Sequence, residues 1–396
     1  MNTSPSTPEK RPVRTPEEQA ALTRFRVNNF DLLRLAAAMQ VVIFHSSIWM
    51  EISSPDASWL LNLIHRIPGV PIFFFVSGFL ISRSYETNSK LADYSRNRAF
   101  RIFPALWVCF VVSLVMVYFS GYFSTVTVPL KTFVAWSVTQ LSFLQFYNPA
   151  FMDGFGNGVL NGSLWTISVE LQFYVITPLL YLSLRGLSKA AFDRVLVVLI
   201  VLFAAFNVFY HHVIPGFNLL ETESMTMKLG YVSFAPWVYM FFIGVLAQRN
   251  FEPLRTLCVG ITKVPIFILL YFLVSYLTID VFGFGDAGQK LDPISYIALC
   301  FCIMSIAYTL PNIANLVLRR NDVSYGLYIY HMPVVNLFIY LGYTGRISHQ
   351  LMAIGCSLVL ASLSWFLIER PVMKLKRHAL NPLKAIRSSP RSSGSG

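Results

Sequence analysis

Apolar residues gather in runs of about 20 along this chain, and polar and charged residues gather in the segments between the runs. At 1.5 Å per helical residue, a run of this length crosses a hydrocarbon layer of roughly 30 Å. The pattern therefore predicts an all-α polytopic membrane protein of about ten transmembrane helices. The expected spans are residues 31–50, 67–86, 102–119, 164–184, 195–214, 230–247, 261–279, 294–311, 323–342 and 350–368.

Composition supports a membrane protein over a soluble one. Of the 396 residues, 55% are hydrophobic and only 13% are charged, whereas soluble domains carry about 25% charged residues. The five cysteines lie within or at the edges of apolar runs and lack a paired C-x-x-C spacing. We therefore expect neither disulfides nor a metal site.

The net charge of +12 raises the question of a nucleic-acid partner, and the positions of the basic residues answer it. With a cytoplasmic N-terminus, 25 of the 31 Lys and Arg residues fall in inner segments and five in outer ones. This asymmetry is the positive-inside signal of a membrane protein. It predicts that both termini are cytoplasmic, with tails at 1–30 and 373–396 around a transmembrane domain at 31–372, and no nucleic-acid partner.

The segment 130–147 is moderately apolar but interrupted by Ser, Thr and Gln. Counting it as a span would invert every later loop and place the basic loops outside. We therefore predict one extra interfacial or re-entrant segment on the outer side. The Gly- and Asn-rich stretch that follows it, up to residue 163, is expected to form an outer loop over a cavity mouth.

Four ionisable residues fall inside the predicted spans, namely Arg34, His45, Glu170 and His331. Each is a candidate functional residue, because an ionisable group at the bilayer centre costs at least a few kcal/mol. Arg34 and His45 are eleven residues apart, so they face the same way about 16 Å apart along one helix. The predicted topology places Arg34 near the cytoplasmic surface and His45 deep in the membrane, at a depth similar to Glu170.

Two helical faces carry polar stripes that predict an interior cavity. They comprise Thr166, Glu170, Tyr174, Thr177 and Tyr181 on the fourth span, and Ser324, Tyr328 and His331 on the ninth. A deep histidine near a carboxylate suits general-base catalysis, with His45 as the base and Glu170 orienting its ring. The same residues leave two alternatives open: a proton-coupled transporter or flippase of lipid-linked sugars, and a non-catalytic scaffold.

Arg96, Arg98 and Arg101 cluster where the chain re-enters the membrane after the second span. They fit either lipid headgroups or a phosphate-bearing cytosolic cosubstrate, since arginine binds phosphate in a bidentate manner. Pro104 is expected in the first turn of the following helix, where its missing N–H has no cost.

Six motifs spread from residue 30 to 372 resemble those of the acyltransferase-3 family, integral-membrane O-acyltransferases that acetylate sugars of cell-surface polysaccharides. They are FDLLRLAAAMQVVIFH, GVPIFFFVSGFLIS, RNRAFRIFPALW, NGSLWTISVELQFYVITPLLY, VSYGLYIYHMPV and LIERPV. The resemblance implies a cytoplasmic acyl-CoA, by default acetyl-CoA, as cosubstrate, with no permanently bound cofactor. It also implies a surface polysaccharide or lipid-linked glycan as acceptor and a bacterial inner membrane as location.

The resemblance also implies roles for residues at matching positions. Arg34 and His45 match the hallmark pair, and Glu369 with Pro371 matches the final E-x-P. We expect His45 and Glu170 to be catalytic; Arg34, Arg98 and Arg101 to bind acyl-CoA; and Ser168, Tyr328 and His331 to bind substrate.

Overall fold

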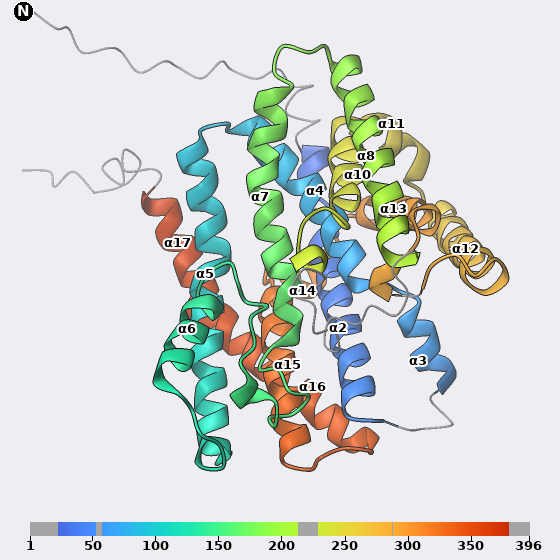
Figure 1. The fold of residues 1–396 in the computed structure, drawn as a ribbon. Coiled ribbons are helices and arrows are strands. Elements are labelled where there is room, and N and C mark those ends of the chain that lie inside the picture. Colours follow the sequence, from blue (N-terminus) through green and yellow to red (C-terminus); the bar gives the residue numbers. More distant parts are fainter. Residues whose placement is uncertain (1–22, 53–57, 213–228, 287, 380–396) are drawn as a thin grey trace, which may run out of the picture.

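A computed structural model describes residues 23–52, 58–212, 229–286 and 288–379. The first 22 residues and residues 380–396, which belong to the two predicted tails, lie outside this range. The described residues form helices and connecting loops, with no strand among them (Figure 1). The α-helices are α2 Phe30–Trp49, α3 Ser58–His65, α4 Gly69–Thr87, α5 Leu91–Phe119, α6 Leu130–Gln140, α7 Trp165–Ser183, α8 Lys189–His212, α10 Val238–Arg249, α11 Phe251–Cys258, α12 Lys263–Ser275, α13 Pro293–Tyr308, α14 Ile313–Leu318, α15 Ser324–Tyr340, α16 Ile347–Ser364 and α17 Arg370–Ala379.

A helix occupies each of the ten predicted ranges, so the all-α prediction is confirmed. Seven described helices are long and apolar enough to cross a membrane, and the chain is a multi-pass membrane protein. α10 and α13 are shorter apolar helices, and α15 has 17 residues. The count of ten crossings and the cytoplasmic position of both termini stay predictions.

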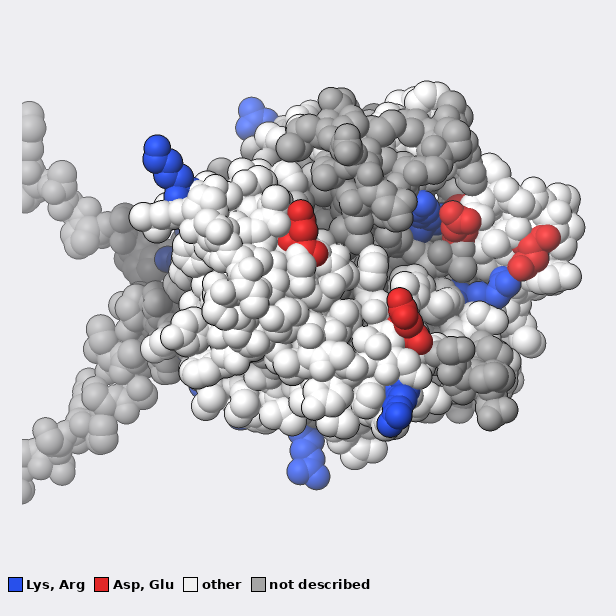
Figure 2. Space-filling view, turned by 60° about the horizontal axis from the view of Figure 1, so that its bottom comes forward, with Lys and Arg blue, Asp and Glu red and all other residues white. Residues whose placement is uncertain are grey.

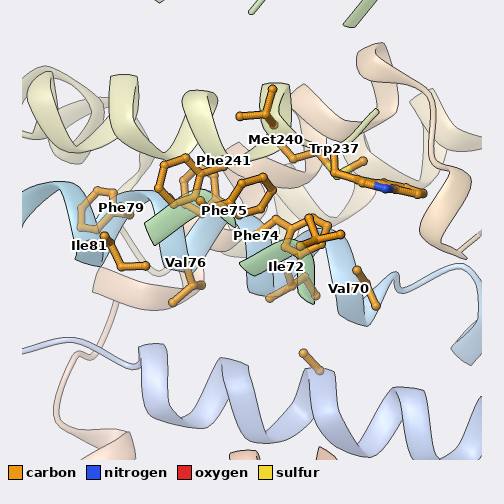
Figure 3. Close-up of a cluster of buried hydrophobic side chains, with 14 of the residues drawn as sticks. Val70, Ile72, Phe74, Phe75, Val76, Phe79, Ile81, Trp237, Met240 and Phe241 are labelled. Atoms are coloured by element: carbon orange, nitrogen blue, oxygen red, sulfur yellow. The ribbon is translucent and has the colours of Figure 1, made fainter. Parts of the chain in front are cut away.

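α4 forms the centre of the bundle, between α2 and α10 (Figures 1 and 3). Its aromatic side chains Phe74, Phe75 and Phe79 pack toward α10, where they meet buried apolar residues such as Trp237 and Phe241. Glycines explain the close approach of the two helices. A Cβ on Gly78 would lie 2.0 Å from the carbonyl oxygen of Phe241, and one on Gly244 would lie 2.3 Å from that of Phe75. Small residues at such crossings let membrane helices pack backbone to backbone.

The segment 130–147 does not form a spanning helix. α6 has 11 residues, or about 16 Å of helix, which is half of the hydrocarbon thickness. Its end contacts the middle of α5, because Trp107 Nε1 donates to the carbonyl of Leu141 at 2.9 Å. The Gln140 side chain donates to two carbonyls of the returning chain, those of Gln145 and Tyr147, at 3.1 Å each. α6 and the returning segment thus form a hairpin against α5, and its interfacial or re-entrant position stays a prediction.

The hairpin and the loop that follows it belong to the end of the bundle drawn at the bottom of Figure 1. Figure 2 brings that end forward. This face is largely uncharged, and its few charged side chains include blue and red ones that touch at the right of the view. That this end is the outer side stays a prediction from the positions of lysine and arginine.

One local prediction is wrong. α5 begins at Leu91 rather than near residue 102, so Pro104 lies inside the helix and not in its first turn. The apolar run that predicted the span begins near residue 102, but the more polar residues 91–101 before it are helical as well. Two other prolines, Pro178 in α7 and Pro333 in α15, also lie inside helices. Pro178 removes the helical donor for the carbonyl of Tyr174, and the Tyr94 hydroxyl donates to that carbonyl instead, at 3.0 Å.

Candidate active site

The two predicted polar stripes face the interior of the bundle. On α7, Thr166, Tyr174 and Thr177 are buried, and on α15, Tyr328 and His331 are buried. α15 packs along α2, which carries Arg34 and His45, while α7 packs on α4. The stripes therefore line the inner faces of helices that surround α4, as the sequence pattern predicts.

His45 and His331 form a hydrogen-bonded pair between α2 and α15. His45 Nδ1 lies 2.9 Å from His331 Nε2, and the two rings are stacked at an interplanar angle of 15°. His331 Nδ1 lies 2.6 Å from the backbone carbonyl oxygen of Tyr328, one turn earlier in the same helix. His331 is fully buried. The pair is therefore one end of a short hydrogen-bond chain that terminates on the backbone.

The end of this chain sets the proton positions for two neutral rings. The carbonyl oxygen of Tyr328 can only accept, so His331 Nδ1 must carry the proton. His331 Nε2 is then the acceptor, and His45 Nδ1 must donate to it. As a consequence, Nε2 of His45 is left without a proton. A neutral imidazole nitrogen in this state is able to take a proton from a hydroxyl group.

Glu170 occupies a different position from the one expected beside His45. Its Oε1 accepts hydrogen bonds from Ser77 at 2.6 Å and from Tyr174 at 2.7 Å. The prediction that Glu170 orients the His45 ring is not matched by a contact between them; His331 contacts His45 Nδ1 instead. The reason lies in the helix order, because α4 packs on both α2 and α7. Similar predicted depths in the membrane therefore do not imply contact between the two residues.

A cavity of about 120 Å³ connects the predicted acyl-CoA residues with the polar stripes. Its apolar wall includes Phe73, Phe74 and Ile167. Its polar lining consists of Arg34, Ser77, Arg98, Arg101, Thr166, Glu170, Tyr174, Ser324, Tyr325 and Tyr328. The structure thus brings all three predicted acyl-CoA arginines to the same cavity as Glu170 and Tyr328.

The histidine pair lies just beyond the wall of this cavity. Tyr328 lines the cavity, and its ring packs on that of His331 with 5.8 Å between centroids. The Tyr328 hydroxyl is 2.6 Å from Thr166 Oγ1, which joins α15 to α7. Tyr328 is therefore the side chain between the cavity and the histidines.

Arg34 and Arg101 share one carboxylate that the sequence analysis missed. Asp322 Oδ2 lies 2.5 Å from Arg101 Nη2 and 3.2 Å from Arg34 Nη2. Glu369, in the predicted E-x-P motif, lies 3.7 Å from the other Arg101 terminal nitrogen. Burial alone would raise the pKa of Asp322, but the two guanidinium groups and the Ser324 hydroxyl outweigh it and hold this pKa well below its usual range. Asp322 is therefore an anion that compensates two half-buried cations.

Arg98 has no carboxylate partner among the described residues. It donates to Ser84 Oγ at 3.4 Å, and its guanidinium carbon lies 5.7 Å from the centre of the Tyr174 ring. Its Nε is buried without a hydrogen-bond partner in the described part of the chain. Of the three predicted acyl-CoA arginines, Arg98 is thus the one whose charge remains uncompensated.

Ser168 lies outside the cavity lining and contacts the hairpin that α6 and the returning segment form. Its hydroxyl donates to Gln145 Oε1 at 2.7 Å, and both side chains are buried. Within the described residues, no group of three or more His, Cys, Asp or Glu side chains could hold a metal ion.

Sequence reasoning missed Asp322 and Ser77 for different reasons. Asp322 follows two arginines in a short polar loop, and only its position two residues before Ser324 hints at a helix cap. Ser77 was present in the GVPIFFFVSGFLIS motif, where a polar residue within an apolar run was a signal that could have been used.

The chain is similar to known acyltransferases over most of its length. Residues 27–369 match the acyltransferase-3 family model, described as an acyltransferase domain. The chain is 33% identical over 365 residues to nodulation protein 10 of Rhizobium leguminosarum bv. viciae, covering 88% of this chain and 94% of that protein. It is 27% identical over 355 residues to the O-acetyl transferase of Shigella phage Sf6, covering 87% and 95%.

A more distant relative is the peptidoglycan O-acetyltransferase OatA of Listeria monocytogenes, 23% identical over 381 residues, which cover 89% of this chain and 56% of that protein. No solved structure gives a significant match. The family match covers most of the chain, including every residue of the cavity and the histidine pair. The chain belongs to the acyltransferase-3 family and is a multi-pass membrane acyltransferase.

Proposed function

We propose that this protein transfers an acetyl group from cytoplasmic acetyl-CoA to a hydroxyl group of a cell-surface polysaccharide or lipid-linked glycan, in a bacterial inner membrane. The observation that carries the proposal is the hydrogen-bond chain from the Tyr328 carbonyl through His331 to His45, which leaves His45 Nε2 free to accept a proton. Two relatives named as O-acetyltransferases support the acetyl group and the hydroxyl acceptor. Family membership favours chemistry over the transporter and scaffold alternatives.

In the proposed reaction, His45 Nε2 removes the proton of the acceptor hydroxyl as its oxygen attacks the thioester carbonyl. The C–S bond breaks, the acetyl group passes to the oxygen, and the CoA sulfur leaves with the proton that His45 returns. His331 stabilises the imidazolium form of His45 by accepting from its Nδ1–H. The histidine partner replaces the carboxylate in the familiar arrangement of base and orienting group.

The donor is proposed to enter the cavity from the end that carries Arg98. Its guanidinium has an unpartnered N–H and no carboxylate partner among the described residues, so it is suited to a phosphate of CoA. Arg34 and Arg101 add positive potential there, while Asp322 holds them in place. Glu170 and Ser77 line the path of the pantetheine arm, whose amide N–H groups need acceptors.

The acetyl group is proposed to reach the histidines past Tyr328, which separates them from the cavity. The acceptor approaches from the side of the re-entrant hairpin, which Ser168 anchors through Gln145. Tyr328 and His331 thereby meet both substrates, and Ser168 acts on the acceptor side through the hairpin.

The direct test is proton NMR of purified surface polysaccharide from cells that lack this protein. The cells are complemented with the wild type, with His45→Gln, or with the control His349→Gln, whose ring contacts a loop carbonyl away from the cavity. We expect O-acetyl signals with the wild type and His349→Gln but not with His45→Gln, at equal protein levels in the membrane. Equal acetylation in cells without the protein would contradict the function, and equal acetylation with His45→Gln would contradict the assigned base.

A further inference from the structure

Pro333 interrupts the hydrogen bonding of α15 two residues after His331. Because proline has no N–H, the carbonyl of Ile329, four residues earlier, loses its helical donor. Ile329 is fully buried among the helices. A buried carbonyl without a partner is costly in a membrane protein, so another group must donate to it.

Asn161 supplies that donor from the loop before α7. Its Nδ2 lies 2.7 Å from the carbonyl oxygen of Ile329, and Cys109 Sγ on α5 lies 3.3 Å from the same oxygen. The Asn161 amide is itself oriented, because its Oδ1 accepts from the Ser163 hydroxyl at 2.8 Å. Asn161 is 6% exposed. The outer loop is thus joined to the interrupted turn of α15 by an oriented and buried donor.

The preceding carbonyl of α15, that of Tyr328, is the one that orients His331. The Tyr328 carbonyl accepts from His331 Nδ1 at 2.6 Å, and Ser163 Oγ lies 3.5 Å from it. Asn161 and Ser163 therefore contact two successive carbonyls in the turn from which the histidine chain begins. A shift of this turn would move the acceptor of His331 Nδ1, and with it the proton arrangement of both rings.

We propose that Asn161 is a positioning residue for catalysis: by holding the Ile329 carbonyl that Pro333 leaves free, it fixes the turn of α15 whose Tyr328 carbonyl sets the tautomer of His331. The proposal rests on the proposed function of the histidine pair. Asn161 does not line the cavity with the three arginines. It therefore acts on the chemical step and leaves donor binding unchanged.

Asn336, which lies on α15 like His331, provides a matched control for Asn161. Its side chain also ties the outer loop to α15, by donating to the carbonyls of Val159 and Leu160 and by accepting from the N–H of Asn157. It is as buried as Asn161, but the loop backbone and not the Ile329 carbonyl is its partner. Asn336→Ala weakens loop attachment in general, whereas Asn161→Ala weakens the turn next to His331.

The test measures kcat and KM for acetyl-CoA with purified full-length protein in detergent, for Asn161→Ala, His331→Gln and the double variant. We expect Asn161→Ala to lower kcat by about 10- to 100-fold, as small misplacements of catalytic groups do, with KM for acetyl-CoA changed by less than about twofold. The double variant should be no slower than His331→Gln alone, because residues that act through one group are not additive. In the control, the loss from Asn336→Ala should multiply with that from His331→Gln.

Two outcomes overturn the inference separately from the proposed function. If His331→Gln is slow and the Asn161→Ala loss multiplies with it, Asn161 does not act through His331. If Asn161→Ala raises KM in parallel with its loss of kcat, it acts on donor binding. By contrast, wild-type kcat in His331→Gln would overturn the proposed function itself. Cys109→Ala removes the second donor to the Ile329 carbonyl and tests the proposal if Asn161→Ala does not fold. It should lower kcat less than Asn161→Ala does, and this loss should disappear when His331→Gln is also present.

Discussion

Two polar clusters lie about 16 Å apart along α2, and they differ in the kind of interaction that joins their members. At one end, Arg34 and Arg101 meet the shared carboxylate of Asp322. At the other end, His45 meets His331, and neither ring contacts a carboxylate among the contacts the structure describes. The first cluster consists of charges that compensate each other, whereas the second is a chain of neutral hydrogen bonds with one free nitrogen.

The difference separates a structural task from a chemical one. The charged cluster joins the beginning of α2, the middle of α5 and the beginning of α15, so removing Asp322 takes away the one carboxylate that both arginines share. The neutral pair contributes less to holding helices together, but it sets the proton positions of the proposed base. The comparison predicts large effects on stability at the first cluster and large effects on rate at the second.

The largest expected effect on stability is that of Asp322→Asn. It leaves Arg34 and Arg101 without their shared carboxylate, although Arg34 keeps Asp31 and Arg101 keeps Glu369, so the free energy of unfolding should fall by about 1.5–3 kcal/mol. Chemical unfolding in mixed detergent micelles measures this change. The control is Asp93→Asn, because the ion pair of Asp93 with Arg96 lies at the surface and should contribute at most about 1 kcal/mol. Equal losses in the two variants would show that the charged cluster is not a structural centre.

A smaller effect is expected for Arg98→Met, which keeps much of the side-chain volume but removes the uncompensated charge. Loss of a charge-assisted hydrogen bond to a phosphate should raise KM for acetyl-CoA by about 10- to 100-fold, with little change in stability. Steady-state kinetics and unfolding on the same preparations test both parts. A KM for acetyl-CoA equal to that of the wild type would show that Arg98 does not bind the donor.

The smallest effect is expected for mild acid on the charged cluster. The pKa of Asp322 is held well below its unfolded value, so the stability it contributes is present above the unfolded pKa of about 3.9 and lost only as pH falls through the folded pKa. In a Glu369→Gln background, which removes the second carboxyl group beside Arg101, the difference in unfolding free energy that Asp322→Asn causes should therefore be the same at pH 7 and at pH 5. A difference that shrinks over this interval would contradict the compensated arrangement.

Much of the fold could be predicted, because the membrane imposes a strong pattern on sequence. Apolar length located helices at all ten predicted ranges, and polar stripes showed which faces of α7 and α15 lie inside. The breaks between helices were harder to predict. α5 extends past its apolar run to Leu91, and α6 is too short and too polar for hydropathy to show how deeply it returns along α5.

The site could be predicted as a set of residues but not as a set of contacts. Arg34, Arg98, Arg101 and Glu170 do meet in one cavity. His45 and His331 were both candidates, but the hydrogen bond between them depends on α15 packing against α2 while α4 separates Glu170 from His45. Depth in the membrane can be inferred from one helix at a time. The side chain that each residue contacts depends on which helices lie next to one another, and the sequence of one helix does not show this.

The most direct test of the histidine pair is the rate of acetyl transfer by purified protein carrying His45→Gln, His331→Gln or both. General-base catalysis raises the reaction rate by about 10²- to 10⁴-fold. The rate of acetyl transfer should therefore fall by a factor in this range in each single variant. Because both residues serve one proton transfer, the double variant should be about as slow as His45→Gln alone. Losses that multiply, or wild-type transfer by His331→Gln, would contradict the account.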